Sequence, residues 1–360
     1  MILWIDRETY CDLDLKVVGT YRYAERAEDL LVAYAIDDGP AAVWDCTLEE
    51  IPDDLFRAME EADEVWAHNA QFDKAVHNGP RQLHLPRIAL PRWRCTMALA
   101  LSHALPGSLE ELCMVLDVPE DQAKLKEGKK LIRLFTMPQP ANRKVQRPNR
   151  ETHPEEWARF KAYAANDIVA MRECYRRIPR FNWDATAVAE WHCDQRINER
   201  GFHVDRTLTE AGIRAAETEK ARIAARFREL TMGVVDRPSQ RDQFLAYLND
   251  WYGLGIDNTR SDTFLQLLKD PNLSPVCAEL LQLSIAANKT STAKYAALDP
   301  AIQDDDRFRG ALQFAAASRT RRWGGRLFQP QNLPSRGLPP AYMVDVYIEA
   351  LKAGNHDIFF

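Results

Sequence analysis

The chain has 360 residues and a formal net charge of −6, with 46% hydrophobic and 28% charged residues. This length exceeds one ordinary hydrophobic core and predicts about two domains, and the composition is typical of a soluble globular protein. The sequence has no basic start followed by a signal-like apolar run, and no stretch of about 18 apolar residues, so we expect neither export nor a membrane span.

The predicted elements of the first half mix strands and helices. Apolar runs that are typical of buried strands are "ILWI" (2–5), "LLVAYAIDDGPAAVWDC" (30–46) and "EVWAHNA" (64–70). The Asp-Asp-Gly turn inside the second run predicts a hairpin. Residues 96–105 and 108–116 have helical patterns, and Ser108 with Glu111 forms a capping box at the start of the second.

A long amphipathic helix is predicted for residues 154–178, where apolar side chains recur every three or four positions after a proline-rich loop. The pattern then becomes almost entirely helical up to about residue 299, interrupted near "NERGFHVD" (198–205). We therefore place boundaries near residues 181 and 300. They separate an α/β domain (1–180), a mainly helical region (181–300) and a last region (301–360).

Cysteines and arginines give two further signals. The seven cysteines are scattered and none forms a Cys-x-x-Cys pair, which favours reduced, buried thiols and argues against zinc. Residues 317–336 form a local basic stripe in an acidic protein, with five arginines and no acid: Arg319, Arg321, Arg322, Arg326 and Arg336.

Four carboxylates stand at the ends of predicted strands or on the long helix. Asp6 and Glu8 are two residues apart at the end of the first strand, so both can face the same side. Asp73 follows the strand-like run at 64–70. Asp167 comes four residues after Tyr163, so these two side chains share one helical face. Ligand sites in α/β layers commonly gather at such strand ends.

Carboxylates without a histidine or cysteine partner favour hard cations such as Mg²⁺ or Mn²⁺. Two such ions about 3.5–4 Å apart can hold a phosphodiester, generate hydroxide and stabilise the leaving oxygen. A tyrosine hydroxyl beside the acids can hydrogen-bond the attacking water. Each acidic motif alone also fits an ordinary strand end, turn or helix face. The combination in this order favours a two-metal site.

The segments "WIDRET" (4–9), "HNAQFD" (68–73) and "YAANDIVA" (163–170) resemble, in order, the three motifs of the 3′–5′ proofreading exonuclease superfamily. The tyrosine is the mark of the subtype found in family A DNA polymerases. The resemblance implies a ribonuclease H-like α/β domain over residues 1–180, with a mixed central sheet flanked by helices. It also implies metal-dependent hydrolysis of phosphodiesters at DNA 3′ ends.

The resemblance implies a role for each acid. Asp6 would bridge two divalent cations, Glu8 and Asp167 would complete the tighter site, Asp73 would support the second ion, and Tyr163 would orient the nucleophile. One residue departs from the motif, because the family usually has an apolar or aromatic residue where Arg7 stands. Successive strand residues point to opposite faces, so we expect Arg7 to point away from the metals. Asn69 and Phe72 are expected to shape the strand cleft.

Later segments resemble phage-type DNA polymerase I: "DLKVVGTYRYAE" (14–25), "KLKEGKKLIRLF" (124–135), "INERGFHVD" (197–205), "ANKTSTAKYAAL" (287–298) and "DDRFRGALQFAAASRTRRWGGRLFQPQNLP" (305–334). They imply a polymerase-thumb-like region at 181–300 and an incomplete palm start at 301–360. The expected DNA contacts, mainly to backbone phosphates, are Arg319, Arg321, Arg322, Arg326, Gln331 and Asn332. The family has glycine at the position of Arg321.

A polymerase of this family needs a further strand carrying Asp-x-Ser-x-x-Glu after the Gln-Asn-Leu-Pro motif, and no such strand is found here. We therefore expect no polymerase activity from this chain alone. It would be a truncation, or one half of a split polymerase whose partner chain supplies palm and fingers. Expected partners are a single-stranded DNA 3′ end or a primer-template, in the cytoplasm of a bacterium or infected host. A non-catalytic DNA-binding or assembly subunit, and an RNA exonuclease, stay open as alternatives.

Overall fold

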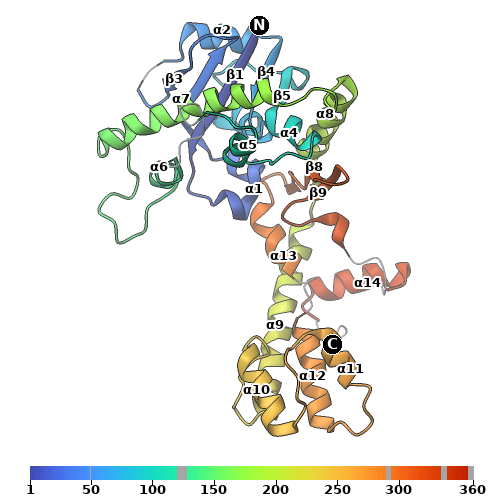
Figure 1. Cartoon of the computed structure of the whole chain (residues 1–360). Coiled ribbons are helices and arrows are strands. Elements are labelled where there is room, and N and C mark those ends of the chain that lie inside the picture. Colours follow the sequence, from blue (N-terminus) through green and yellow to red (C-terminus); the bar gives the residue numbers. More distant parts are fainter. Residues whose placement is uncertain (49, 120–127, 289–292, 334–338, 356–360) are drawn as a thin grey trace. The chain divides into compact units, whose positions relative to one another are not determined.

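The computed structural model describes residues 1–48, 50–119, 128–288, 293–333 and 339–355. The chain divides into two compact units (Figure 1). The first contains Met1–Val204 and Pro300–Gln331, and the second contains Asp205–Asp299 and Asn332–Phe360. Arg336 and parts of three polymerase-like segments, 124–127, 289–292 and residue 334, lie outside the described residues.

The centre of the first unit is a five-stranded sheet in the order β3-β2-β1-β4-β5. Its strands are β1 (Ile2–Tyr10), β2 (Glu28–Ile36), β3 (Ala42–Asp45), β4 (Glu64–Ala67) and β5 (Trp93–Cys95). β1, β2 and β3 pair antiparallel, whereas β1, β4 and β5 pair parallel. The α/β class and the mixed sheet expected from the sequence are confirmed. The run at 64–70 ends as a strand at Ala67, where the chain turns into a helix.

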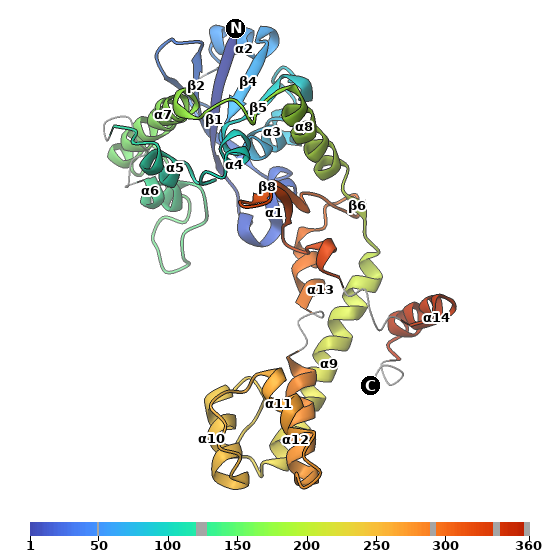
Figure 2. The ribbon, with the colours of Figure 1, turned by 45° about the vertical axis from the view of Figure 1, so that its right-hand side comes forward.

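Alternation along β1 divides the apolar side chains between two cores. Leu3 and Ile5 are buried in one cluster, together with the helix α2 (Asp53–Glu61). Trp4 is buried in the other, against the long helix α7 (Pro154–Arg177). α7 packs across β1, β2 and β3, and it covers one face of the sheet in both views (Figures 1 and 2). Even-numbered residues of β1 therefore face α7.

Local signals explain where the helices of the first unit begin. Pro154 occupies the first turn of α7, with Glu155 and Glu156 beside it, which suits the positive end of the helix dipole. Ser108 caps α5 by accepting the N–H of Glu111, as the capping box predicts. The remaining helices are α1 (Leu15–Ala24), α3 (Gln71–His77), α4 (Thr96–Ser102), α5 (Leu109–Val115), α6 (Gly128–Phe135) and α8 (Ala185–Arg200), with 3₁₀ turns at Pro80–Gln82, Leu90–Arg92, Asp299–Ala301 and Pro330–Asn332.

The compact units divide after Val204 rather than near residue 181, and they divide again between Asp299 and Pro300, near the second expected boundary. α8 lies within the first unit, because Trp191 is buried in the same cluster as Leu3. Residues 300–331 return to that unit, where Phe314 joins this cluster. They add the short pairs β6 (Phe202–His203) with β7 (Arg307–Phe308), and β8 (Leu312–Ala317) with β9 (Arg322–Gly325).

The second unit is helical in its described part. Its helices are α9 (Arg206–Leu230), α10 (Arg241–Tyr252), α11 (Ser261–Leu267), α12 (Pro275–Ala287), α13 (Ala293–Leu298) and α14 (Ala341–Lys352). Phe227, Phe244 and Phe264 form the centre of its own apolar cluster.

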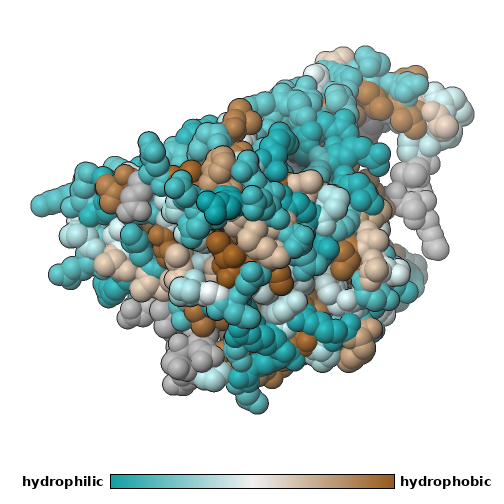
Figure 3. Space-filling view, turned by 90° about the horizontal axis from the view of Figure 1, so that it is seen from above, coloured by the Kyte–Doolittle hydropathy of each residue, from teal (hydrophilic) through white to brown (hydrophobic). Residues whose placement is uncertain are grey.

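Among the described residues, no helix is both long and apolar enough to cross a bilayer. The face drawn in Figure 3 is mostly hydrophilic, with small, separate apolar patches.

Candidate metal centre

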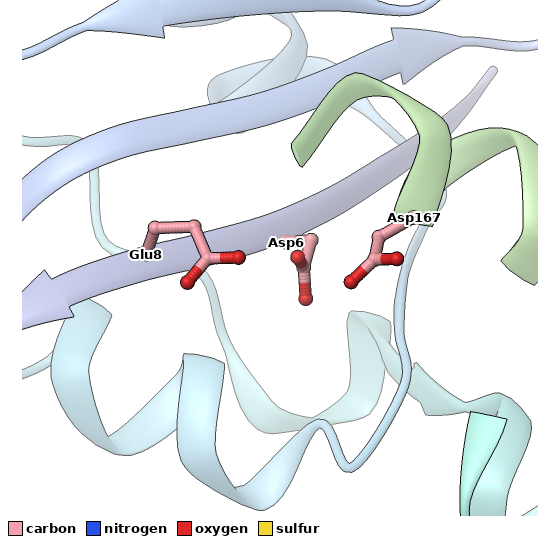
Figure 4. A group of neighbouring side chains, drawn as sticks. All are labelled: Asp6, Glu8 and Asp167. Carbon is pink, nitrogen blue, oxygen red and sulfur yellow. The ribbon is translucent and has the colours of Figure 1, made fainter. Parts of the chain in front are cut away.

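Three carboxylates converge on the α7 side of the sheet. Asp6, Glu8 and Asp167 each offer an oxygen, and these oxygens all lie within 4.8 Å of one another. Asp6 is half-buried, whereas Glu8 and Asp167 are 8% and 5% exposed. Figure 4 shows Asp6 between the other two side chains, with all three carboxylates directed to the same space.

The positions of the three acids follow from local geometry. Asp6 and Glu8 are two residues apart on β1, so the pleat directs both toward α7. β1 continues to Tyr10, so the two acids lie within the strand rather than at its end as expected. α7 packs across β1 and brings Asp167 close to both of them. Gathering three carboxylates in a largely buried place is unfavourable without a counter-charge. An all-oxygen donor set of this kind fits a hard divalent cation such as Mg²⁺ or Mn²⁺.

Asp73 lies beside this group but is not one of its three members. It is on α3, is 2% exposed, and its Oδ1 accepts the backbone N–H of Arg7 at 3.1 Å. Burial, followed by the nearby charge of Asp6, raises the pKa of Asp73 well above its usual value. The carboxyl group therefore favours its protonated form unless a positive charge arrives next to it.

Tyr163 lies one helical turn before Asp167 and is 1% exposed. Its ring is nearly parallel to that of Phe160, at 6.4 Å between centroids and 7° between planes. Gly128 of α6 packs against this ring so closely that a Cβ there would lie 2.0 Å from Cε2. Burial and then the charge of Asp167 raise the pKa of Tyr163, so its hydroxyl stays protonated.

Arg7 points away from the three carboxylates, as the strand alternation predicts. It is 4% exposed and forms an ion pair with Asp29, and its Nη2 lies 2.6 Å from Nδ1 of His77. Its guanidinium therefore does not lie between Asp6 and Glu8. Neither Asp29 nor His77 carries a sequence signal that would have linked it to Arg7.

The two residues expected to shape the strand cleft lie elsewhere around α3. Asn69 has a left-handed backbone (φ 67°) in the turn before α3, and its side chain lines a cavity of about 10 Å³ against Asp194 and Arg326. Phe72 is half-buried and its ring lies 5.8 Å from that of Tyr23, in a separate apolar cluster. The structure therefore does not group either with the three carboxylates.

The arginines of the basic stripe fall into two classes. Arg319, Arg321 and Arg322 are exposed at the turn of the β8–β9 hairpin. Arg321 has φ 53°, a conformation that favours glycine, which matches the glycine that the polymerase family has there. Arg326 is half-buried instead, and its Nε donates to Oε1 of Gln313 at 3.1 Å. Gln331 and Asn332 are exposed and follow this hairpin.

Asp194 of α8 is a buried acid that the sequence did not single out. It is 1% exposed, and its Oδ2 accepts the side-chain N–H groups of Gln195 and Asn198 at 3.0 and 3.1 Å. Burial raises its pKa to about 7. The folded chain therefore holds a proton between about pH 4 and 7 that the unfolded chain has lost. The free energy of unfolding therefore falls as the pH rises through that window, because the folded chain loses the proton on Asp194.

Comparison with known proteins finds similarity both in sequence and in structure, although no family model matches the chain. A DNA polymerase of Bacillus phage SP02 is 34% identical over 363 residues, which cover 99% of this chain and 54% of that protein. The chain is thus homologous to a phage DNA polymerase and spans about half its length. The POL domain of Pol1 from M. smegmatis, solved in complex with DNA primer-template and dNTP, shares the fold with a TM-score of 0.52 and 14% identity. That match covers 86% of this chain and 50% of the other.

Proposed function

We propose that this chain is a metal-dependent 3′–5′ exonuclease that hydrolyses phosphodiesters at DNA 3′ ends, as the proofreading part of a phage-type DNA polymerase I. The observation that carries the proposal is the convergence of Asp6, Glu8 and Asp167 on one face of the sheet. Homology to a phage DNA polymerase supports DNA as the substrate and DNA replication as the setting.

The topology supports a ribonuclease H-like fold for residues 1–180. Three antiparallel strands are extended by two parallel ones, and the acids lie on the central strand and on the helix that crosses it. The helical residues 181–300 then correspond to a polymerase thumb, and residues 301–360 to the start of a palm.

Two divalent cations, Mg²⁺ or Mn²⁺, would supply an activated water and charge stabilisation of the leaving oxygen. Asp6 lies between Glu8 and Asp167 (Figure 4), so it is the carboxylate best placed to serve both ions. Glu8 and Asp167 complete the first site. Asp73, next to Asp6, supports the second ion once a cation favours its ionised form.

Tyr163 serves to orient the attacking water. Burial and the charge of Asp167 raise the pKa of Tyr163 in the metal-free chain and favour its protonated hydroxyl, which suits a hydrogen-bond donor better than a general base. A protonated hydroxyl beside Asp167 can still hydrogen-bond a water, and this contact can direct the lone pair of the water toward a phosphorus atom. The close packing of Gly128 against the ring fixes it for this task.

DNA is the proposed partner, and the exposed arginines of the β8–β9 hairpin are its proposed phosphate contacts. Arg319, Arg321 and Arg322 suit this role because they are exposed at one turn. Arg326 is better placed to hold the hairpin through Gln313. Neither match supports the second protein chain expected from the sequence, and it is not part of the proposal.

The deciding experiment compares single-stranded DNA, a mismatched duplex and RNA, each labelled at the 5′ end, with Mg²⁺ or with EDTA. We expect stepwise shortening of the DNA substrates from the 3′ end in Mg²⁺ only, and none with Asp6→Ala or Asp167→Ala. Asp194→Asn is the control, since it changes a buried acid that is not one of the three carboxylates. Wild-type rates in both alanine variants would falsify the proposal, and DNA binding without hydrolysis would favour a non-catalytic subunit.

A further inference from the structure

Arg7 is a buried charge that the proposed reaction does not use, and it is held by two neighbours. Its Nη1 forms an ion pair with Asp29 of β2, whose side chain is 4% exposed. Its Nη2 lies 2.6 Å from Nδ1 of His77, at the last position of α3. A buried arginine–carboxylate pair rarely adds net stability over apolar residues of similar size. A role in placing other groups is therefore the better explanation.

The hydrogen bonds of His77 fix its tautomer. Its Nε2 lies 2.8 Å from the carbonyl oxygen of Pro86, so this nitrogen carries the proton and donates it. Nδ1 then has a free lone pair and accepts from the Arg7 guanidinium. Burial and the charge of Arg7 lower the pKa of His77 to about 3, which keeps the ring neutral and this arrangement intact.

A β-bulge brings Asp29 to the face of the sheet on which Arg7 lies. Glu8 pairs with Leu31, but Thr9 pairs with Asp29, so β2 has one extra residue, Leu30, at this point. In a regular ladder Asp29 would share the face of Leu31, which packs against the α7 side. One extra residue reverses the side to which the following residues point.

Arg7 also contacts α3 through its main chain. β4 pairs with β1 only from Ile2 to Trp4, so the N–H of Arg7 lies beyond the end of this ladder. Asp73 accepts that N–H through Oδ1 at 3.1 Å. Asp73 and His77 are four residues apart on α3 and share one helical face. Arg7 thus contacts α3 at two points one turn apart.

We propose that Arg7, with His77, is a positioning residue that fixes α3 to β1 and so sets the Asp73 carboxylate against Asp6. This inference rests on the proposed function, in which Asp73 supports the second cation. The main-chain N–H of Arg7 holds the Asp73 carboxylate itself. The Arg7 guanidinium, through His77, holds α3, the helix that carries Asp73. The carboxylate of Asp29 balances the positive charge of the Arg7 guanidinium, which lies on the side of the sheet opposite α7.

The test changes His77, because loss of Arg7 itself would leave Asp29 buried and unpaired and would endanger folding. His77→Leu removes the acceptor for Arg7 and keeps similar volume, whereas His77→Asn keeps an acceptor at the position of Nδ1. His192→Leu is the matched control: His192 is also buried and donates to a main-chain carbonyl, that of Trp93 at 3.0 Å, but it contacts none of the acids. All variants are compared as full chains, well below their unfolding temperatures.

Two readouts decide the proposal. Mn²⁺ titration followed by electron paramagnetic resonance should show the second ion bound about tenfold more weakly in His77→Leu, with His77→Asn and His192→Leu near the wild type. Hydrogen–deuterium exchange in EDTA should be faster at the Arg7 amide in His77→Leu only. Wild-type Mn²⁺ binding and exchange in His77→Leu would overturn the proposal, as would equal losses in His192→Leu. A wild type that binds no Mn²⁺ would instead overturn the proposed function, while the exchange measurement would still decide the contact with α3.

Discussion

Gly128→Ala is the substitution that most directly tests whether packing holds Tyr163 in place. The new Cβ would lie 2.0 Å from Cε2 and 2.6 Å from Cδ2 and Cζ of the Tyr163 ring. The ring has little room to move away from it, because Tyr163 is 1% exposed. Either α6 or the ring must therefore shift.

The expected change in the stability of Gly128→Ala follows from two opposing effects. Overpacking a buried site costs about 1–3 kcal/mol. Alanine is favoured over glycine inside a helix by about 1 kcal/mol. We therefore expect a net loss of up to about 2 kcal/mol in the free energy of unfolding. A shift of the Tyr163 hydroxyl by a fraction of an ångström should also reduce nuclease activity by about ten- to a hundredfold.

Urea unfolding measures the first effect, and the release rate of labelled nucleotides from a single-stranded DNA 3′ end measures the second. Gly107→Ala is the control, because a Cβ at Gly107 would meet nothing closer than 3.5 Å. The control should keep wild-type stability and activity. If Gly128→Ala is as stable and as active as Gly107→Ala, the close packing of Gly128 on Tyr163 does not limit either property, and the reasoning is refuted.

Three further predictions concern the metal, a buried acid and the basic hairpin. Mn²⁺ should raise the midpoint of thermal unfolding more for the wild type than for Asp167→Asn, since binding to the folded state stabilises it; equal shifts would contradict the assignment of that carboxylate. Asp194→Asn should gain up to about 4 kcal/mol over the wild type near pH 8 and little near pH 4, because the pKa of Asp194 is raised to about 7; urea unfolding that gives the same difference at both pH values would exclude this origin. Replacing Arg319, Arg321 and Arg322 with alanine should lower the salt dependence of DNA binding, by about one unit of slope per lost phosphate contact; an unchanged slope in fluorescence anisotropy would remove these residues from the interface.

Short-range regularities made part of the site predictable. Asp6 and Glu8 share a face because strands have a period of two, and Asp167 follows Tyr163 by one helical turn. These rules need only neighbouring residues, and the structure places the three acids together. The same alternation predicted that Arg7 would point to the other face.

Long-range features were not predictable from the sequence. The partners of Arg7 depend on a β-bulge that no turn residue marks, and on His77, which is 70 residues away. The packing of Gly128 on Tyr163 joins two helices across a long loop. The true extent of the first unit was missed for a related reason. The helical pattern of α8 does not tell which core its apolar face will join, and Trp191 joins the core around Leu3.

The chain leaves the first unit after Val204 and returns to it at Pro300, so residues 205–299 of the second unit are inserted in the first. Phe202 of β6 pairs with Phe308 of β7, and this pair joins the two ends of the inserted segment. During synthesis, the first unit must therefore wait for residues 300–331 before Phe314 can complete its core around Trp191. Closing a loop as long as residues 205–299 costs chain entropy, so we expect the contacts between the two parts of the first unit to form late in folding.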